Sequence, residues 1–241
     1  MVTSTISTSP AKRWEIDRLR PSRDPRGSPE TRKQQILAAA AERFAERGFH
    51  GVSIDELGAA TGITGPALYR YFSSKEAVLA ELLVGISEVL VQEAEACVAS
   101  VSRSSPASAS ASDSGSEDTV LELIRSHVRF ALDHPELIRI HNRDLMSLRK
   151  TERDRVRRLQ RRYIEIWVAA LRRAQKSLDR QSALIRVRAV FGLINSTPYI
   201  TASSRPRVEH ELELMALAAF DASTAVDACT PYSARLSGTS R

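Results

Sequence analysis

The sequence predicts an all-α protein with an N-terminal three-helix domain and a C-terminal domain of about six helices, without a β-sheet. Apolar residues recur every three or four positions over most of the chain, which is the period of an α-helix. Ala, Leu, Arg and Glu dominate the composition, aromatic residues make up only 5%, and runs of β-branched residues are short. Capping residues, Gly and Pro fall between the apolar stripes and mark where the helices begin and end.

The bulk composition restricts the classes of function. The chain has 241 residues, 42% of them hydrophobic, which suits one medium domain or a small domain joined to a larger one. A net charge of +6 and a pI of about 9.7 fit a nucleic-acid binder, although ribosomal and membrane-surface proteins share such charge. Two cysteines make no disulfide framework or metal cluster, and no apolar run approaches the roughly 18 residues of a membrane span. We therefore expect a cytoplasmic protein with no membrane partner.

The N-terminal part begins with a basic arm and one firm helix. Residues 1–28 are rich in Ser, Thr, Pro and Arg, and we expect them to be disordered. This arm is either a solvated tail or a segment that strengthens DNA binding through phosphate or the minor groove. The first helix is predicted over residues 29–47, because Ile36, Ala40 and Phe44 repeat every four residues and a glycine follows.

The stretch from residue 51 to 79 reads as two short helices joined by a tight turn. Ser53 and Glu56 have the spacing of a capping box, so a helix should begin there. Gly62 ends that helix, because glycine enters the left-handed conformation at low cost. Thr64 can cap the next helix, in whose first turn Pro66 is tolerated.

Two short helices with a Gly-containing turn have the shape of a helix-turn-helix, whose second helix enters the major groove of DNA. The alternative is an ordinary helical corner of a core. On the first interpretation, the early residues of the second helix are exposed toward the bases, and two later residues lie next to phosphate. The base-facing set is Gly65, Pro66, Ala67, Tyr69 and Arg70, and the phosphate-facing pair is Tyr71 and Lys75.

A second capping box, Ser73 with Glu76, predicts a third helix that begins near residue 74 and links this domain, residues 29–83, to the rest of the chain. The Ser/Ala-rich segment 100–118 is expected to be a flexible loop. The remaining domain, residues 84–226, then continues with further helices, and a polar tail covers residues 227–241. These further helices are expected near residues 120–131, 135–145, 151–176, 181–199 and 207–225.

The run LYRYFSSKEAVL, residues 68–79, follows an amphipathic helix ending in Gly and the turn TGIT, and it resembles the DNA-binding domain of TetR-family transcriptional regulators. The resemblance covers roughly residues 31–83. It implies that Ser53 and Thr64 hold phosphate at the helix starts, and that Tyr69, Tyr71 and Lys75 contact the DNA backbone. The small side chains at 65–67 offer few hydrogen-bonding groups to base edges, so the operator sequence is not readable.

The resemblance also implies a homodimer formed by the last two helices, which pair with those of a partner in a four-helix bundle. The alternative is that the apolar faces of these helices fill the protomer's own core. The candidate interface residues are Val187, Val190, Ile194, Leu212, Met215 and Ala219.

The same resemblance implies a small-molecule effector bound among the C-terminal helices. The candidate contacts are His127, His141, Arg143, Tyr163, Trp167 and Phe191. The Arg-rich segment 139–162 is either a solvated face or a site for the phosphates of an acyl-CoA thioester, which some relatives in lipid metabolism sense. No resident cofactor and no metal are expected, because the histidines lack a neighbouring Cys or carboxylate cluster.

Taken together, the sequence predicts a ligand-responsive transcriptional regulator, with repression as the default of the family. The alternatives are an activator of the same family and a nonspecific DNA-binding protein. An enzyme is disfavoured, because the sequence contains no Gly-rich phosphate loop after a strand, no nucleophile elbow and no metal-ligand spacing.

Overall fold

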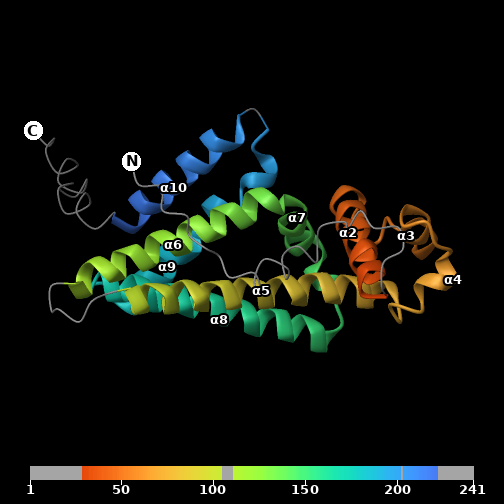
Figure 1. Cartoon of the computed structure of the whole chain (residues 1–241), viewed down its shortest axis with the longest axis horizontal. Coiled ribbons are helices and arrows are strands. Elements are labelled where there is room, and N and C mark those ends of the chain that lie inside the picture. The colour runs from red at the N-terminus through yellow and green to blue at the C-terminus, as the bar shows by residue number, and fades with distance from the viewer. Residues whose placement is uncertain (1–28, 105–110, 202, 222–241) are drawn as a thin grey trace, which may run out of the picture.

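The computed structural model describes residues 29–104, 111–201 and 203–221, with the side chains of 101–104 and 111–114 outside the description. These residues form nine α-helices, two short 3₁₀ turns and no strand. Figure 1 shows an elongated molecule with a small helical domain at one end and long helices running away from it. The predicted all-α class is confirmed within the described ranges. The predicted basic arm (1–28) and polar tail (227–241) lie outside them.

The small domain contains α2 (Pro29–Arg47), α3 (Ile54–Ala60) and α4 (Gly65–Leu68). Helix α2 has the predicted bounds, and its stripe of Ile36, Ala40 and Phe44 is fully buried. Gly48 ends it with a φ of +81°, a conformation that side-chain-bearing residues rarely adopt. The recognition helix α4 is only four residues long, and hydrogen-bonded turns continue its path to Phe72.

Helix α5 (Lys75–Ser104) runs from the small domain along the length of the molecule (Figure 1). Its N-terminus corrects the predicted capping box. Ser74, not Ser73, is the residue before the helix, and its Oγ accepts a hydrogen bond from the Ala77 amide at 3.2 Å.

Helix α6 (Ala111–Asp133) overturns most of the predicted loop. Of the segment 100–118, α5 takes residues up to 104 and α6 takes residues from 111, and 105–110 lie outside the described residues. The Ser/Ala-rich composition suggests a linker, but α6 packs along α5, and tertiary packing stabilises helices of weak propensity.

The remaining elements follow in the predicted order. Pro135 opens α7 directly after the end of α6, as the Pro at the first helical position predicts. The bounds are α7 Pro135–Asp144, η1 Leu145–Ser147, α8 Lys150–Ala174, α9 Arg180–Ile194, η2 Thr197–Tyr199 and α10 Arg205–Asp221.

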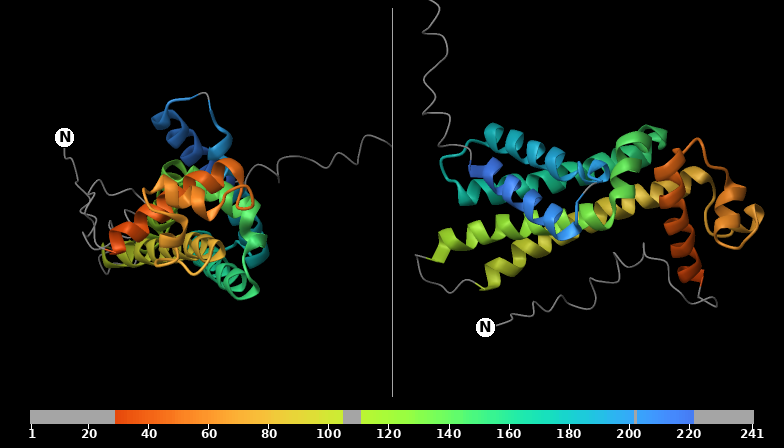
Figure 2. Two further views of the ribbon diagram at one scale, coloured as in Figure 1. Left: turned by 90° about the vertical axis from the view of Figure 1, so that its right-hand side faces the viewer. Right: turned by 90° about the horizontal axis from the view of Figure 1, so that it is seen from above.

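These helices pack into a C-terminal bundle, and one of them also contacts the small domain. Helices α5, α6 and α8 pack side by side and α9 lies against α8, while α10 covers α6 and α9 (Figures 1 and 2). Helix α7 is the C-terminal element that packs most extensively against α2, so it connects the two domains. No described helix is long and apolar enough to cross a bilayer.

Candidate nucleic-acid interface and ligand cavity

The start of α3 is fixed by the predicted capping box. The Ser53 Oγ accepts from the Glu56 amide at 3.2 Å, and the Glu56 carboxylate accepts from the Ser53 amide at 2.7 Å. The Ser53 amide, with the Arg47 guanidinium at 2.7 Å, lowers the pKa of Glu56 to about 2. Glu56 is therefore ionised at neutral pH and acts as a cap, and Ser53 stays exposed beside it.

The turn between α3 and α4 is tight. Gly62 has a φ of +69°, and the Ile63 amide donates to the Gly58 carbonyl at 3.0 Å. A Cβ on Gly58 would lie 2.8 Å from the Ile63 carbonyl oxygen, so only glycine allows this approach. Thr64 then caps α4, with its Oγ1 accepting from the Ala67 amide at 3.3 Å. The chain therefore has the helix-turn-helix geometry that its sequence predicts.

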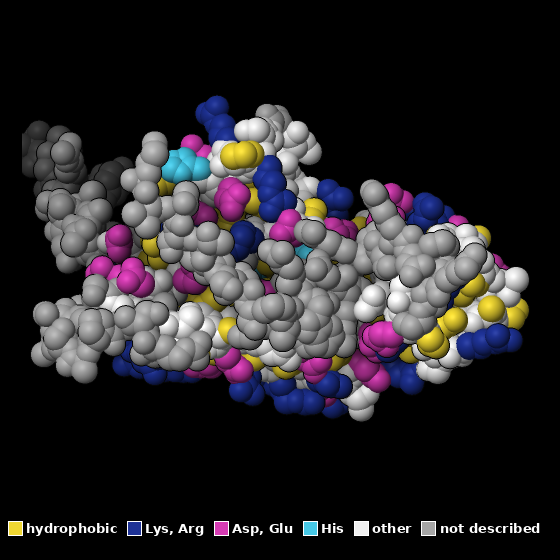
Figure 3. All heavy atoms as spheres, in the orientation of Figure 1, with side chains coloured by type: hydrophobic (Ala, Val, Ile, Leu, Met, Phe, Trp, Pro, Cys, Tyr) yellow, Lys and Arg dark blue, Asp and Glu magenta, His cyan; other side chains and the backbone are white. Residues whose placement is uncertain are grey.

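The tip of this unit presents a small mixed surface at the end of the molecule remote from α10 (Figure 1). Tyr69 is 55% exposed, and Pro66 and Arg70 are also exposed. Ala67 and Tyr71 are half-buried, and Tyr71 packs against the core. Figure 3 shows apolar and basic side chains together at this end.

Two predicted DNA contacts occupy unexpected positions. Gly65 is buried rather than exposed, because the Asp55 carboxylate covers it so closely that an added Cβ would overlap Oδ1. The Lys75 ammonium points inward, where it donates to the carbonyls of Phe49 (2.9 Å) and Val52 (2.8 Å) and lies 4.4 Å from the Phe49 ring centroid. Lys75 thus fastens the loop before α3 to α5, and its contact with phosphate stays a prediction.

A cavity of about 260 Å³ lies among helices α5 to α9. Four of the predicted ligand contacts, His127, His141, Tyr163 and Phe191, line it. The Tyr163 and Phe191 rings stack with their centroids 5.3 Å apart and an interplanar angle of 25°. The lining also includes Gln160, which the sequence analysis missed, although it directly follows an apolar-stripe residue of α8.

The other two predicted ligand contacts lie outside the cavity. Trp167 is 1% exposed and packs edge-on against Phe191 at 5.0 Å between centroids, so it supports the wall from behind. Arg143 faces away from the cavity and donates to the carbonyls of Phe44 and Ala45 at the end of α2. An arginine at a helix C-terminus satisfies carbonyls that lack a partner within the helix. Arg143 is therefore a link between the two domains.

Burial controls the protonation of the cavity. Desolvation lowers the pKa of His127 to about 4, so this imidazole is neutral at pH 7. Desolvation also lowers the pKa of His141 and raises that of Tyr163. The His127 Nδ1 lies 3.1 Å from the Tyr163 hydroxyl, whereas its Nε2 has no hydrogen-bond partner. The buried Oδ1 of Asn195 also has no hydrogen-bond partner. Asn195 lines the cavity and, like Gln160, was not predicted from the sequence.

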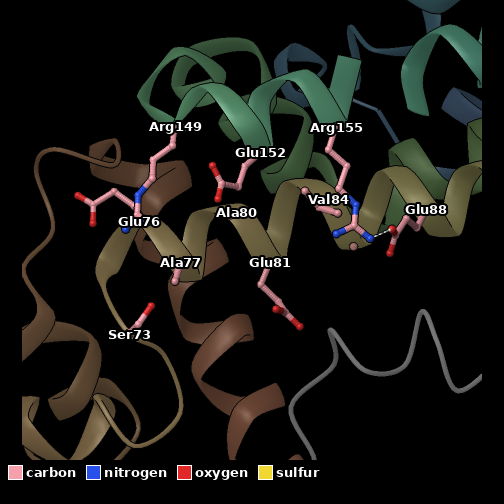
Figure 4. Close-up of a pocket in the computed structure, with 11 residues that line it drawn as sticks. Ser73, Glu76, Ala77, Ala80, Glu81, Val84, Glu88, Arg149, Glu152 and Arg155 are labelled. Atoms are coloured by element: carbon pink, nitrogen blue, oxygen red, sulfur yellow. Dashed lines mark hydrogen bonds and ion pairs between the residues drawn. The ribbon is translucent and has the colours of Figure 1, made fainter. Parts of the chain in front are cut away.

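A larger groove of about 410 Å³ lies between α5 and the start of α8 (Figure 4). Its side chains pair with one another or with neighbours: Arg155 meets Glu88 at 2.5 Å, and Glu81 meets Lys33 of α2 at 2.7 Å. Among the described residues, no group of three His, Cys, Asp or Glu side chains could hold a metal ion. We interpret the groove as a polar contact between the domains.

The arginines of the segment 139–162 are spread over the outside of α8 and over α7. Arg162 pairs with Glu95 at 2.6 Å, and Arg139 of α7 donates to the Pro198 carbonyl at 2.6 Å. Figure 3 shows basic and acidic side chains interspersed along the edge where α8 lies. None of these arginines lines the cavity, so the solvated-face alternative describes most of them.

The predicted dimer contacts divide into two groups. Val187, Val190, Ile194 and Leu212 are at most 1% exposed within the single protomer. For these four residues the interface prediction is wrong, and the alternative of the protomer's own core holds. Met215 is 44% exposed and Ala219 is half-buried.

The same two helices also have an exposed apolar side, which periodicity does not predict. Ile185 on α9 is 60% exposed and Leu214 on α10 is 49% exposed. Both lie beside positions of the apolar stripe, so periodicity assigns them to the polar, solvent-facing side of their helices. Only their apolar side chains indicate that this side could be covered by another surface.

Models of two domain families match the chain. One, described as bacterial regulatory proteins of the tetR family, matches residues 36–82. The other, described as the tetracyclin repressor-like C-terminal domain, matches residues 113–199. Together they cover more than half of the sequence.

Curated relatives match over shorter stretches of the chain. The regulator YdgC of Bacillus subtilis (strain 168) is 48% identical over 51 residues, 21% of this chain and 26% of its own. The activator FasR of Mycolicibacterium smegmatis is 46% identical over 44 residues (18% and 20%), and the repressor KstR2 of Rhodococcus jostii is 36% identical over 69 residues (29% and 34%). The chain thus spans at most about a third of the length of these relatives.

Solved structures match over most of the chain. The TetR-family regulator PfmR of Thermus thermophilus has a TM-score of 0.64 at 22% identity, covering 78% of this chain and 97% of its own. AibR, solved with isovaleryl coenzyme A and operator DNA, has a TM-score of 0.61 at 14% identity (76% and 97%). These likenesses establish a shared fold. With both domain models and the helix-turn-helix geometry in agreement, the chain belongs to the TetR family of transcriptional regulators.

Proposed function

We propose that the protein is a ligand-responsive transcriptional regulator that binds a near-palindromic DNA operator as a homodimer, most simply as a repressor. The observation that carries the proposal is the capped helix-turn-helix, whose exposed Pro66, Tyr69 and Arg70 form the outermost surface of the small domain. Such a unit inserts its second helix into the major groove. The proposal assigns the chain a binding role and no catalytic one.

A dimer is needed because a single four-residue recognition helix reads few base pairs. Dimeric helix-turn-helix proteins place two such helices about 34–36 Å apart, in successive major grooves. The exposed apolar residues Ile185, Leu214 and Met215 on α9 and α10 support these helices as the interface. Ala189 is exposed beside them, and a Cβ on Gly192 would meet nothing within 4 Å, so a partner helix can approach closely.

The cavity among α5 to α9 is the proposed effector site. An acyl-CoA thioester is one candidate effector, as the AibR complex contains isovaleryl coenzyme A. Because no arginine lines the cavity, only an acyl part would enter it, and the phosphates would have to meet arginines on the surface. Calorimetric titration with medium- and long-chain acyl-CoAs tests this candidate. Absence of binding at high micromolar concentration would reject it.

Helix α7 is the proposed connection between effector and DNA. It contributes Leu137, Ile138 and His141 to the cavity wall, and its Arg143 bonds to the end of α2. A ligand that favours one position of α7 would therefore favour one placement of the DNA-binding domain, which is the requirement for allosteric coupling.

The test is selection of bound fragments from sheared genomic DNA of the source organism, followed by sequencing. A short inverted repeat, retained against unrelated competitor DNA with a margin of about 10³ or more at fixed salt, is the expected result. Diffuse enrichment without a motif would favour the nonspecific DNA binder. A reporter gene placed behind the recovered site then separates repression from activation.

A further inference from the structure

The effector cavity has one polar end that lacks hydrogen-bond partners. His127 is 3% exposed, its Nδ1 is paired with the Tyr163 hydroxyl, and its Nε2 is buried without a partner. The Asn195 side chain lies beside His127 and acts to raise its pKa, but no hydrogen bond of normal geometry joins the two, and the buried Asn195 Oδ1 has no other partner. An unsatisfied buried polar atom is destabilising, so such atoms in native proteins need an explanation.

The other polar groups of the lining are already occupied. Ser87 donates its Oγ–H to the Leu83 carbonyl at 2.7 Å. The His141 ring lies between Gln160 and Asn142 and contacts both through its two nitrogens. The open hydrogen-bonding positions of the cavity are therefore concentrated at His127 and Asn195.

The lining carries no formal charge. It contains no Lys, Arg, Asp or Glu side chain. Burial keeps His127 neutral at pH 7, so it offers no positive charge to a ligand. A carboxylate or an ammonium in this cavity would lose its hydration without gaining a counter-ion, which disfavours its binding.

We propose that the cavity selects an apolar ligand, or the apolar part of a larger one, whose single buried polar group is an uncharged hydroxyl or carboxamide. Such a group can both donate to the Asn195 Oδ1 and bond to the His127 Nε2, whereas a carboxylate or a hydrocarbon has no hydrogen to donate to the Asn195 Oδ1. The stacked Tyr163 and Phe191 rings provide the apolar wall. The volume of about 260 Å³ lies just below the usual range of ligand pockets, so the buried part is small.

The test uses two isosteric probes, hexanamide and hexanoate, titrated into the full-length protein at pH 7.5 and followed by calorimetry. Hexanamide is expected to bind at least about tenfold more tightly than hexanoate, because the carboxylate carries a charge into the cavity and only the carboxamide can donate a hydrogen bond to the Asn195 Oδ1. Absence of hexanamide binding at millimolar concentration, or equal or tighter binding of hexanoate, would overturn the proposal.

Two variants connect the preference to the polar end. His127→Phe and Asn195→Ala are each expected to reduce the ratio of the two affinities toward one. His134→Phe is the matched control, because His134 is equally buried and also has an unpartnered Nε2 but does not line the cavity. If His127→Phe fails to fold, Asn195→Ala and the wild-type comparison still decide the matter. Variants that leave the ratio unchanged would contradict the assignment to His127 and Asn195.

This inference rests on the proposed function in treating the cavity as the effector site, and the two fail separately. Hexanamide that binds but leaves DNA affinity unchanged would reject the effector role and retain the ligand chemistry. A protein that binds its operator but prefers hexanoate would retain the regulator and reject the ligand chemistry.

Discussion

At the scale of single residues, Lys75 has two competing roles. Its ammonium bonds to the carbonyls of Phe49 and Val52, which are both buried residues, so Lys75→Met should lower the free energy of unfolding by about 2 kcal/mol. If the ammonium keeps these partners on DNA, the slope of DNA affinity against salt does not change, because no phosphate contact is lost. Urea unfolding and binding at several salt concentrations measure the two quantities.

The control for Lys75 is the exposed Arg70. Arg70→Met should flatten the salt slope by roughly one without affecting stability, because it removes an exposed cation from the surface that faces DNA. If Lys75→Met also flattened the salt slope without affecting stability, the Lys75 ammonium would have to leave its two carbonyl partners when DNA binds and contact a phosphate instead.

His127 makes stability depend on pH. Its pKa is about 4 in the folded protein and about 6.5 when unfolded, so the unfolded state binds the proton first. The stability contribution is complete above pH 6.5 and is lost as pH falls from there toward 4. Between pH 7 and pH 5 the loss should be about 2 kcal/mol.

The measurement is urea unfolding at pH 7 and pH 5, for the wild type and for His127→Gln. The variant should lose less stability than the wild type over this range. The lowered pKa of His141 acts in the same direction in both proteins and cancels in the difference. Equal losses in the two proteins would mean that His127 titrates normally in the fold.

At the scale of elements, the helix-turn-helix depends on close backbone approach at Gly58. A Cβ there would meet backbone atoms at 2.8–3.0 Å, so Gly58→Ala should destabilise the domain by about 1–3 kcal/mol and weaken DNA binding. Gly85 in the middle of α5 is the control. A Cβ at Gly85 meets nothing within 4 Å, and Gly85→Ala should stabilise by about 0.5–1 kcal/mol. Thermal unfolding of both variants tests the contrast, and a neutral Gly58→Ala would show that the turn can widen.

The elements also show what sequence reasoning can reach. A stripe bounded by a cap and a glycine predicts α2 and the α3–α4 turn closely, because these signals are local in the chain. The burial of Gly65 under Asp55 comes from a neighbouring helix, which periodicity does not record. The start of α6 was hidden by a composition typical of linkers, since its helical state depends on packing against α5.

The same limit explains the candidate sites. Four of the predicted ligand contacts line one cavity, because each lies on the apolar face of its own helix and these faces meet in the core. Arg143 and the buried residues of α9 were misplaced, because a helix in a bundle has several faces and the sequence does not say which neighbour each one meets.

At the scale of the whole molecule, the dimer interface is predicted on the exposed side of α9 and α10. Ile185→Glu would place an unpaired charge in an apolar interface, so it should weaken dimerisation by at least about tenfold. Met146→Glu is the matched control, because Met146 is a similarly exposed apolar residue in η1, beside the DNA-binding domain. Sedimentation equilibrium measures both. A dimer that tolerates Ile185→Glu, or one that Met146→Glu dissociates, would place the interface elsewhere.

The proposed coupling between cavity and DNA also belongs to the whole molecule. Arg143 bonds α7 to α2, and α7 forms part of the cavity wall, so Arg143→Gln should uncouple ligand and DNA while leaving each bound separately. Coupling free energies of about 1–3 kcal/mol are typical, and the variant should bring the ligand-induced change in DNA affinity close to onefold. DNA binding with and without hexanamide provides the measurement.

Arg139→Gln is the control for this coupling. Arg139 lies on the same helix and also donates to a backbone carbonyl, but that carbonyl belongs to Pro198 of η2 and not to the DNA-binding domain. Its loss should therefore leave the coupling intact, because no contact between the domains is broken. If both variants abolished coupling, the cause would be a general loosening of α7. If neither did, the signal would pass through the direct continuity of α5 between the two domains.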